Sequence, residues 1–250
     1  MIERTDDDGI AVLTLTHGPV NAMDLELCEA VTTAFRELAD DLARAVVLTG
    51  AGSSFSAGVD LRRIVDGGAG YVKQFLPALA ESFRVPFELG KPVVAAVNGH
   101  AIAGGCVLAA TADVVLMADG RGRIGLPELK VGVPFPRIAL ETMRFRAGEV
   151  GSRRLVVGAQ TYLPADAAAH GIVDEVVDPS ELVKRAVDTA RALADEIPAD
   201  TFAATKAALR REAVERADRY GDADEETERL WIQRAEDGRI AAFLESATRR

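Results

Sequence analysis

Short runs of Val, Ile and Leu alternate with longer stretches in which apolar residues recur every three or four positions. The short runs are typical of buried strands, and the longer stretches are typical of amphipathic helices. Because the two kinds of segment alternate, the pattern predicts an α/β core. The predicted strands are Ile10–Thr16, Ala45–Thr49, Pro92–Val97, Asp113–Ala118 and Ile172–Val177.

Two helices are expected in the first half of the chain. Asp24 can cap a helix that runs to about Leu42, and a second helix covers Val72–Leu89. The glycine-rich stretch Gly67–Gly70 precedes that second helix and predicts a flexible loop.

After Val177 the pattern becomes entirely helical, with Pro198 separating the first two helices. Apolar side chains near the end give this tail a face that packs back on the core or reaches a neighbouring subunit. We therefore expect a core over residues 1–195 and a helical region over residues 196–250. The predicted helices are Pro179–Ile197, Pro198–Asp218 and Asp222–Thr248.

Composition narrows the class of protein. The 250 residues carry a formal net charge of −10, which argues against a nucleic-acid-binding surface but leaves room for a local basic patch. No apolar run is long enough to span a bilayer, and the acidic N-terminus lacks a secretory signal. The two cysteines, Cys28 and Cys106, lie in apolar helical patterns, and no Cys/His cluster has metal-ligand spacing. We expect a cytoplasmic protein without a metal.

The loop over residues 49–61 is the first candidate site. It leaves a predicted strand, is rich in Gly and Ser, and enters a helix at Asp60, so it exposes backbone amides. Connections of this kind are more often structural than functional. A dinucleotide site is disfavoured, because Phe55 stands where the third glycine of that fingerprint belongs.

The segment over residues 98–108 is the second candidate site. Gly104 and Gly105 open a helix directly after a buried strand, where backbone N–H groups favour a negative charge. Two glycine-bounded N–H groups from separate strand ends can converge on one oxyanion, such as a thioester carbonyl that becomes an enolate. Val107 lies one turn into this helix.

Glu128 is the third candidate. Pro127 fixes the backbone before it, and its apolar neighbours indicate a partly desolvated carboxylate. Desolvation raises a carboxyl pKa and makes the group a better base. Alone, Glu128 would be read as an ordinary surface residue in a turn.

The three segments together, in this order, resemble the crotonase superfamily, also called the enoyl-CoA hydratase/isomerase family. The resemblance covers most of the chain. The segments that carry it are Gly18–Met23, Phe55–Leu61, Lys91–Leu108, Gly125–Phe135 and Ala165–Val177.

This resemblance implies a spiral of ββα units with C-terminal helices that form trimers, often paired into hexamers. It also implies an acyl-CoA substrate, with coenzyme A as part of that substrate and no separate cofactor. Val59 and Gly104 would supply the oxyanion-hole amides, and backbone near Val20 and Ala22 would hold coenzyme A. Arg62 or Arg63 could meet its phosphates, although a solvated surface arginine is the simpler interpretation. Further substrate contacts are expected at Ser56, Ala57, Gly58, Asp60, Leu61, Gly105, Val107, Pro127 and Phe135.

Val107 favours one reaction over another. Hydratases of this family use two glutamates, and the matching positions here are Val107 and Glu128. A valine cannot orient or deprotonate water, whereas one base and an oxyanion hole suffice to move a proton from C2 to C4 of a 3-enoyl thioester. The stretches Ala103–Leu108 and Ile124–Glu128 look like the mitochondrial-type Δ3,Δ2-enoyl-CoA isomerase branch. We therefore expect a shift of the double bond to the 2-trans position.

Two alternatives stay open at this point. A hydratase or another crotonase activity could recruit a different acid, such as Asp60 or a residue of the stretch Gly67–Tyr71. A catalytically degenerate homologue would bind acyl-CoA thioesters and leave them unchanged. In each case the walls of the acyl pocket are expected from residues 65–90 and from Pro134–Met143.

Overall fold

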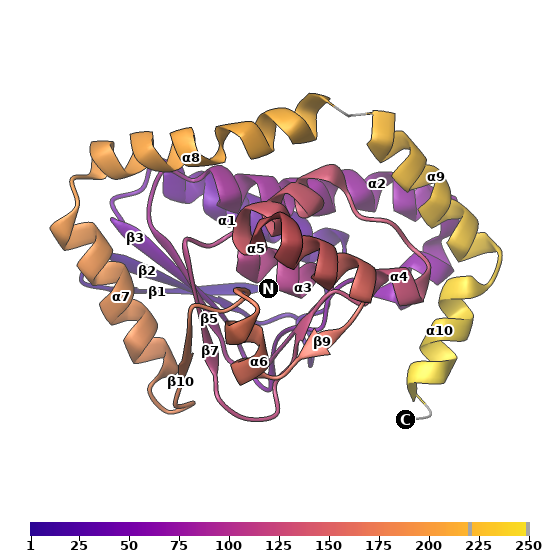
Figure 1. Ribbon diagram of the computed structural model, residues 1–250, viewed down its shortest axis with the longest axis horizontal. Helices are drawn as coiled ribbons and strands as arrows, with labels where there is room; N and C mark the ends of the chain where they lie inside the picture. The colour runs from indigo at the N-terminus through magenta and orange to yellow at the C-terminus, as the bar shows by residue number, and fades with distance from the viewer. Residues whose placement is uncertain (220–221, 249–250) are drawn as a thin grey trace.

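A computed structural model describes residues 1–219 and 222–248 (Figure 1). A six-stranded sheet forms its centre, in the order β1-β2-β3-β5-β7-β10. The edge strand β1 is antiparallel to β2, and the other neighbours are parallel. The strands are β1 (Ile2–Asp7), β2 (Ile10–Leu15), β3 (Ala45–Gly50), β5 (Val93–Val97), β7 (Val114–Ala118) and β10 (Glu175–Val177).

A second sheet has four short strands in the order β4-β6-β8-β9. The first three are parallel to one another, and β9 is antiparallel to β8. Strands this short carry no readable alternation of apolar and polar residues, so the sequence did not reveal this sheet. The strands are β4 (Ser54–Ser56), β6 (His100–Ile102), β8 (Ile124–Gly125) and β9 (Thr161–Tyr162).

Helices follow pairs of strands in a repeating order. Along the chain, β3-β4-α2, β5-β6-α3 and β7-β8-α4 each place one strand in the large sheet and the next in the small sheet. This order confirms the expected ββα units. The helices are α1 (Leu25–Ala39), α2 (Leu61–Glu88), α3 (Gly104–Ala110), α4 (Glu128–Val131), α5 (Arg137–Gly158), α6 (Pro164–Ala169), α7 (Leu182–Glu196), α8 (Ala199–Arg219), α9 (Asp222–Glu236) and α10 (Arg239–Thr248).

Both faces of the large sheet are covered, which explains why its parallel strands read as continuous apolar runs. In β2, Ile10 and Val12 face a cluster that includes Ala186 and Ala190 of α7. Leu13 and Leu15 face the opposite cluster, which contains apolar residues of α1, α2 and α3. Figure 1 shows the sheet between these two groups of helices.

The five strands predicted from sequence are all present, but β10 is shorter than predicted and β1 was missed. Strand β1 is an exposed edge with a mostly polar sequence, so hydrophobic pattern alone could not find it. The predicted cap of α1 is confirmed, because the Asp24 carboxylate accepts a hydrogen bond from the Leu27 N–H at 2.9 Å.

Two expectations about helices are wrong. Gly67–Gly70 is not a loop: it lies inside α2, which starts at Leu61 and bends at Gly68, where φ is 53°. The single helix expected over Asp222–Thr248 is two helices, because the chain turns at Gly238 with φ 81°. In both places a glycine takes up a left-handed backbone conformation that other residues rarely adopt.

The C-terminal helices pack back on the core of their own chain. Helix α8 contacts α5, α9 contacts α2, and α10 contacts both α2 and α4. Trp231 of α9 is 2% exposed, and Phe243 and Leu244 of α10 pack against the main apolar cluster. The division at residues 195 and 196, and a role of this region in trimer formation, stay predictions.

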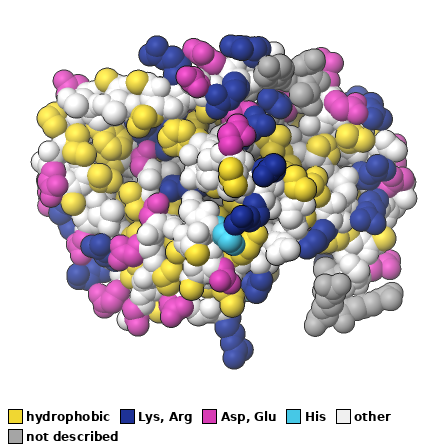
Figure 2. Space-filling model, in the orientation of Figure 1, with side chains coloured by type: hydrophobic (Ala, Val, Ile, Leu, Met, Phe, Trp, Pro, Cys, Tyr) yellow, Lys and Arg dark blue, Asp and Glu magenta, His cyan; other side chains and the backbone are white. Residues whose placement is uncertain are grey.

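The surface carries mixed charge. Figure 2 shows acidic and basic side chains interspersed over the visible face, with several basic groups around its centre. The net charge of −10 is therefore not gathered into one acidic surface on this face. In the part of the chain that the structure describes, no helix combines the length and the hydropathy that crossing a membrane requires.

Candidate active site

Three parallel strands of the small sheet deliver the three candidate catalytic residues to one edge. Val59 follows the end of β4, Gly104 follows the end of β6, and Glu128 follows the end of β8. In the sheet β6 lies between β4 and β8, and the carboxyl ends of parallel neighbours meet at the same edge. The sequence predicted the three residues, and the small sheet is what brings them together.

The loop that carries Val59 is held by the segment Val20–Met23. The Ser56 hydroxyl donates to the Asn21 carbonyl at 2.7 Å, and the Ala57 N–H donates to the Val20 carbonyl at 2.9 Å. The Met23 N–H donates to the Gly58 carbonyl at 2.8 Å. The expected coenzyme A segment and the expected oxyanion loop are therefore one hydrogen-bonded unit.

Asn21 closes this unit, a role that the sequence analysis missed. Its φ of 50° is left-handed, and its side-chain amide donates to the Ser54 carbonyl at 3.0 Å. Its side-chain oxygen accepts from the His17 N–H at 2.8 Å. Asparagine tolerates left-handed backbone better than most residues, so Asn21 in a turn was a signal that could have been used.

Two glycines let the loops after β4 and β6 touch. A Cβ atom on Gly58 would lie 2.4 Å from the Ile102 carbonyl oxygen, and one on Gly105 would lie 2.4 Å from the Ser56 carbonyl oxygen. Real Cβ atoms do not approach oxygen so closely, so both positions require glycine. The two loops are in direct backbone contact for this reason.

The amides of Val59 and Gly104 are free to bind a ligand. Neither N–H donates a hydrogen bond to any group within residues 1–219 and 222–248. A Cβ on Gly104 would lie 3.0 Å from the Met23 sulfur and 3.5 Å from Phe83. Two unused N–H donors on touching loops, beside apolar side chains, can stabilise an oxyanion.

Glu128 is the first residue of α4 and is 8% exposed. Its Oε2 atom is buried and has no hydrogen-bond partner among the described residues. Burial raises the pKa of Glu128 to about 8. The carboxyl group thus holds a proton more tightly than an ordinary glutamate, as expected of a base that takes a proton from carbon.

Cys106 lies close to this carboxyl group. Burial first, and then the Glu128 charge, raise the pKa of the Cys106 thiol. Both Cys106 and Cys28 are free and buried, in keeping with the apolar helical patterns in which the sequence places them. The surroundings of Glu128 are therefore apolar or neutral.

Comparison with known proteins identifies the family. The family model for enoyl-CoA hydratase/isomerase matches residues 5–248. The chain belongs to the enoyl-CoA hydratase/isomerase family.

Relatives in this family have different activities. The chain is 31% identical to the human mitochondrial enoyl-CoA delta isomerase 1, over 90% of this chain and 75% of that protein. It is also 31% identical to a short-chain-enoyl-CoA hydratase of Clostridium acetobutylicum, over 83% of this chain and 78% of that protein. The crystal structure of human mitochondrial delta3-delta2-enoyl-CoA isomerase superposes with a TM-score of 0.89 at 27% identity, covering 99% of this chain and 98% of that chain. These relatives confirm the crotonase fold, and acyl-CoA chemistry is consistent with the family.

Val107, on which the expectation of isomerisation rests, lies in the core. Val107 is 1% exposed in α3, and its N–H donates to the Ala103 carbonyl at 3.1 Å. Asp60, an alternative acid, caps α2 by accepting from the N–H groups of Arg62 and Arg63 at 3.0 and 3.3 Å. The structure gives neither position the role of a second catalytic carboxylate.

The two arginines after Asp60 differ. Arg63 donates a hydrogen bond to Glu26 at 2.9 Å, and its guanidinium lies over the Tyr71 ring. Its charge is therefore already paired within the protein. Arg62 is exposed and makes no ion pair among the described residues. Of the two, Arg62 is the one available to an anion. Leu61, next to it, is the first residue of α2.

A cavity of about 540 Å³ lies between α2, Pro136 and α9. It includes residues from both stretches that were expected to form the acyl pocket. Helix α9 adds a third wall that the sequence did not predict, because contacts across so many residues leave no local pattern. Phe135, next to the cavity, is buried. The lining residues are Leu76, Pro77, Ala80, Pro136, Asp224, Glu225, Thr227 and Glu228.

Proposed function

We propose that this protein is a Δ3,Δ2-enoyl-CoA isomerase. The substrate is a 3-enoyl-CoA, and the product is the conjugated 2-trans-enoyl-CoA. Two features together carry the proposal. Oε2 of Glu128 is buried without a partner among the described residues, and an aliphatic residue, Val107, stands where the resemblance assigns a hydratase its other glutamate.

In the proposed reaction the thioester carbonyl accepts hydrogen bonds from the N–H groups of Val59 and Gly104. Glu128 takes a proton from C2, the negative charge moves to the carbonyl oxygen as a dienolate, and the same carboxyl group returns the proton at C4. Each amide donor is worth on the order of 3–4 kcal/mol to such an oxyanion. The reaction needs no cofactor besides the coenzyme A of the substrate.

Several residues around this centre are proposed to bind substrate. The backbone of Val20 and Ala22 holds coenzyme A beside the loop from Ser56 to Gly58, and Arg62 meets its phosphates. The acyl chain runs beside Phe135 into the cavity between α2 and α9. Leu79 and Phe83 support this path, because they lie near Gly104 on the helix that lines the cavity.

Apolar surroundings also disfavour the competing reaction. Water addition needs a group that orients and activates water, and Val107 cannot do this. Cys106, on the same helix, is a neutral thiol. Exclusion of water from the reacting carbons therefore supports proton transfer over hydration.

The test gives the purified protein a 3-enoyl-CoA and follows the absorbance of the conjugated thioester. A second sample receives crotonyl-CoA and is analysed for 3-hydroxyacyl-CoA. We expect rapid isomerisation and little hydration. Efficient hydration with no isomerisation would contradict the proposal, and binding of both thioesters without conversion would indicate a degenerate acyl-CoA-binding homologue.

Two further expectations accompany this function. A homotrimer, or a dimer of trimers, is proposed from the family resemblance, and sedimentation velocity tests it. A cytoplasmic location is proposed as well, and cell fractionation tests that.

A further inference from the structure

The C-terminal helices α9 and α10 hold the stretch of chain that directly follows Glu128. Four hydrogen bonds join these helices to residues 130–137, and each links residues at least 87 positions apart. The bonds are Arg239 Nη2 to the Lys130 carbonyl at 2.9 Å, Trp231 Nε1 to the Pro134 carbonyl at 2.9 Å, Thr227 Oγ1 to the Phe135 carbonyl at 3.4 Å, and the Arg137 N–H to Asp224 Oδ1 at 2.8 Å.

The segment from Val133 to Pro136 cannot hold itself in place. It lies between α4 and α5 without regular secondary structure, and Pro134 and Pro136 have no N–H to donate. Trp231 of α9 holds the segment instead, because its indole is 2% exposed and its N–H donates to the Pro134 carbonyl. The side chain thus ties this segment to α9.

Arg239 acts at the other end of the same segment. Helix α4 is one turn long and ends at Gly132, whose φ is 102°. A Cβ on Gly132 would lie 3.1 Å from Cγ of Arg239, so the arginine packs directly against this turn. The Gly132 and Val133 N–H groups both donate to the Glu128 carbonyl, at 2.9 and 3.2 Å. A shift of the turn therefore shifts the backbone of Glu128.

We propose that Trp231 and Arg239 are positioning residues for Glu128, which fix its backbone and keep water from its carboxyl group. The proposal rests on the proposed function for its kinetic part. A base misplaced by about 1 Å can lose about 10²-fold in rate, so the order of this segment matters to the reaction. Neither residue is proposed to touch the substrate.

Charged groups adjoin the segment on α4, α5, α9 and α10. Asp224 accepts from the Arg137 N–H, and the Arg137 side chain pairs with Glu141 at 3.5 Å. Lys130 is exposed on α4, Arg234 pairs with Asp237, and Arg239 donates to a carbonyl. On the side of α3, Glu128 faces the neutral Cys106 thiol. Because burial is the main cause of the raised pKa of Glu128, loosening the segment admits water and lowers that pKa towards its ordinary value.

The experiment compares Arg239→Met, Arg239→Lys and Trp231→Phe with the wild type. Arg229→Met is the matched control, since Arg229 lies on α9 like Trp231 and, among the described residues, binds only its neighbours Glu226 and Gln233. We expect Arg239→Met and Trp231→Phe to lower kcat about tenfold, with KM for the 3-enoyl-CoA within about twofold. The rise of kcat/KM with pH shifts to lower pH, and Arg239→Lys recovers part of kcat.

A second readout needs no activity. The free energy of unfolding is measured for the wild type and for each variant, with and without the added substitution Glu128→Gln. The difference between the two members of each pair depends on pH through the Glu128 proton. We expect that dependence to shrink in Arg239→Met and Trp231→Phe and to be unchanged in Arg229→Met. This measurement separates the positioning role from the proposed function, because it can be made even if the protein does not isomerise 3-enoyl-CoA.

Two results would overturn the positioning role. One is a pair of variants whose kcat and pH profiles match those of Arg229→Met. The other is a loss of kcat in step with lost stability, with the pH profile and the Glu128-dependent free energy unchanged, which would indicate a purely structural contact.

Discussion

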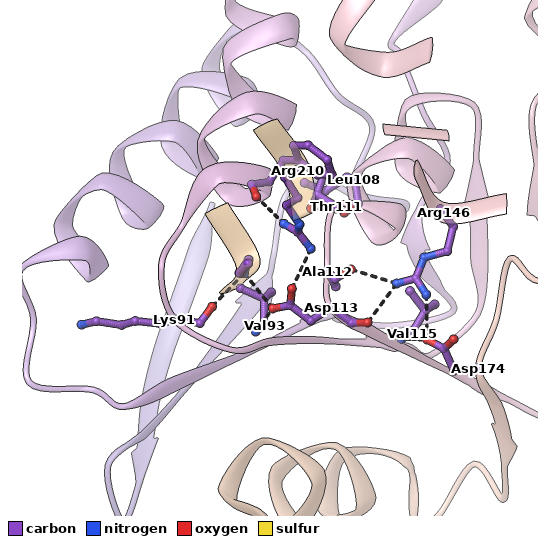
Figure 3. A network of polar contacts seen from close by, with 12 residues as sticks. Lys91, Val93, Leu108, Thr111, Ala112, Asp113, Val115, Arg146, Asp174 and Arg210 are labelled. Carbon is purple, nitrogen blue, oxygen red and sulfur yellow. Dashed lines mark hydrogen bonds and ion pairs between the residues drawn. The ribbon is translucent and has the colours of Figure 1, made fainter. Parts of the chain in front are cut away.

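Acidic groups that are buried or largely buried have opposite surroundings in two regions of this molecule. Near the start of β7, Asp113 accepts hydrogen bonds from Lys206 and Arg210 of α8, both at 2.7 Å, and from the Val93 N–H at 2.8 Å. Figure 3 shows Arg210 reaching Asp113 beside the ion pair between Arg146 and Asp174. At the edge of the small sheet, Oε2 of Glu128 is buried and finds no hydrogen-bond partner in residues 1–219 and 222–248.

Glu141 of α5 sharpens the contrast because it is the same residue type. It is fully buried, and it binds Arg144 at 2.7 Å and Arg216 at 2.8 Å. A buried charge without a partner is costly, and proteins normally pair it. Asp113 and Glu141 are paired and join α8 to the core. Within the described residues, Oε2 of Glu128 has no partner, and Glu128 follows β8 at the same edge of the small sheet as the two free amides.

The paired acidic groups and Glu128 are therefore expected to differ in what they contribute to stability and to the reaction. Burial lowers the pKa of Lys206 to about 8 and that of Arg210 to about 10, while the Asp113 charge opposes both shifts. Removal of Asp113 should thus damage the fold, whereas removal of the Glu128 charge should damage only the reaction.

The largest stability effect is expected from Asp113→Ala. It leaves two buried cations without a counter-ion, so the free energy of unfolding should fall by about 3–5 kcal/mol. Chemical denaturation measures this. The control is Asp188, which pairs with Lys184 and Arg191 on the surface of α7, because loss of an exposed ion pair in Asp188→Ala should leave the free energy of unfolding nearly unchanged. Equal losses in the two variants would remove the distinction between the regions.

A smaller change in stability but a clear loss of rate is expected from Gly105→Ala. The new Cβ would meet the Ser56 carbonyl oxygen and push apart the loops that present the Val59 and Gly104 amides. Losing one oxyanion donor costs about 10²–10³ in kcat. Gly70→Ala is the control, since open space surrounds Gly70. Full isomerase activity in Gly105→Ala would show that the contact of these loops is not required.

The mildest perturbation is a change of pH. Glu128 acts as a base only when ionised, so kcat/KM should rise with pH and level off above about pH 8. Stability should change in the opposite direction. The folded pKa is about 8 and the ordinary value is 4.5, so the folded state holds an extra proton between these values and the contribution of Glu128 to stability falls as pH rises.

The pH prediction is checked by rate profiles and by denaturation at a series of pH values. Glu128→Gln serves as the reference, because it lacks the titrating group and its denaturation series should lack this term. An activity that is flat from pH 6 to pH 9 would place the essential base outside Glu128.

Sequence patterns revealed the long elements and the chemical motifs, but not how they meet. Strands such as β3 and β5 are continuous apolar runs, so they were readable, whereas β8 has two residues and no pattern at all. Gly104 and Glu128 were found as motifs, yet their shared edge depends on strand pairing over more than 20 residues. The unpartnered oxygen of Glu128 and the contacts of Trp231 depend on side-chain packing, which a linear pattern does not encode.

The central claim is that Glu128 contributes to the reaction rather than to the fold. One variant, Glu128→Gln, tests it when the isomerisation rate of a 3-enoyl-CoA and the free energy of unfolding are measured on the same preparation at about pH 8. We predict a rate lower by about 10²–10⁴ with a free energy of unfolding equal to or above that of the wild type. An unchanged rate, or a loss of rate that only follows a loss of folded protein, would contradict the claim.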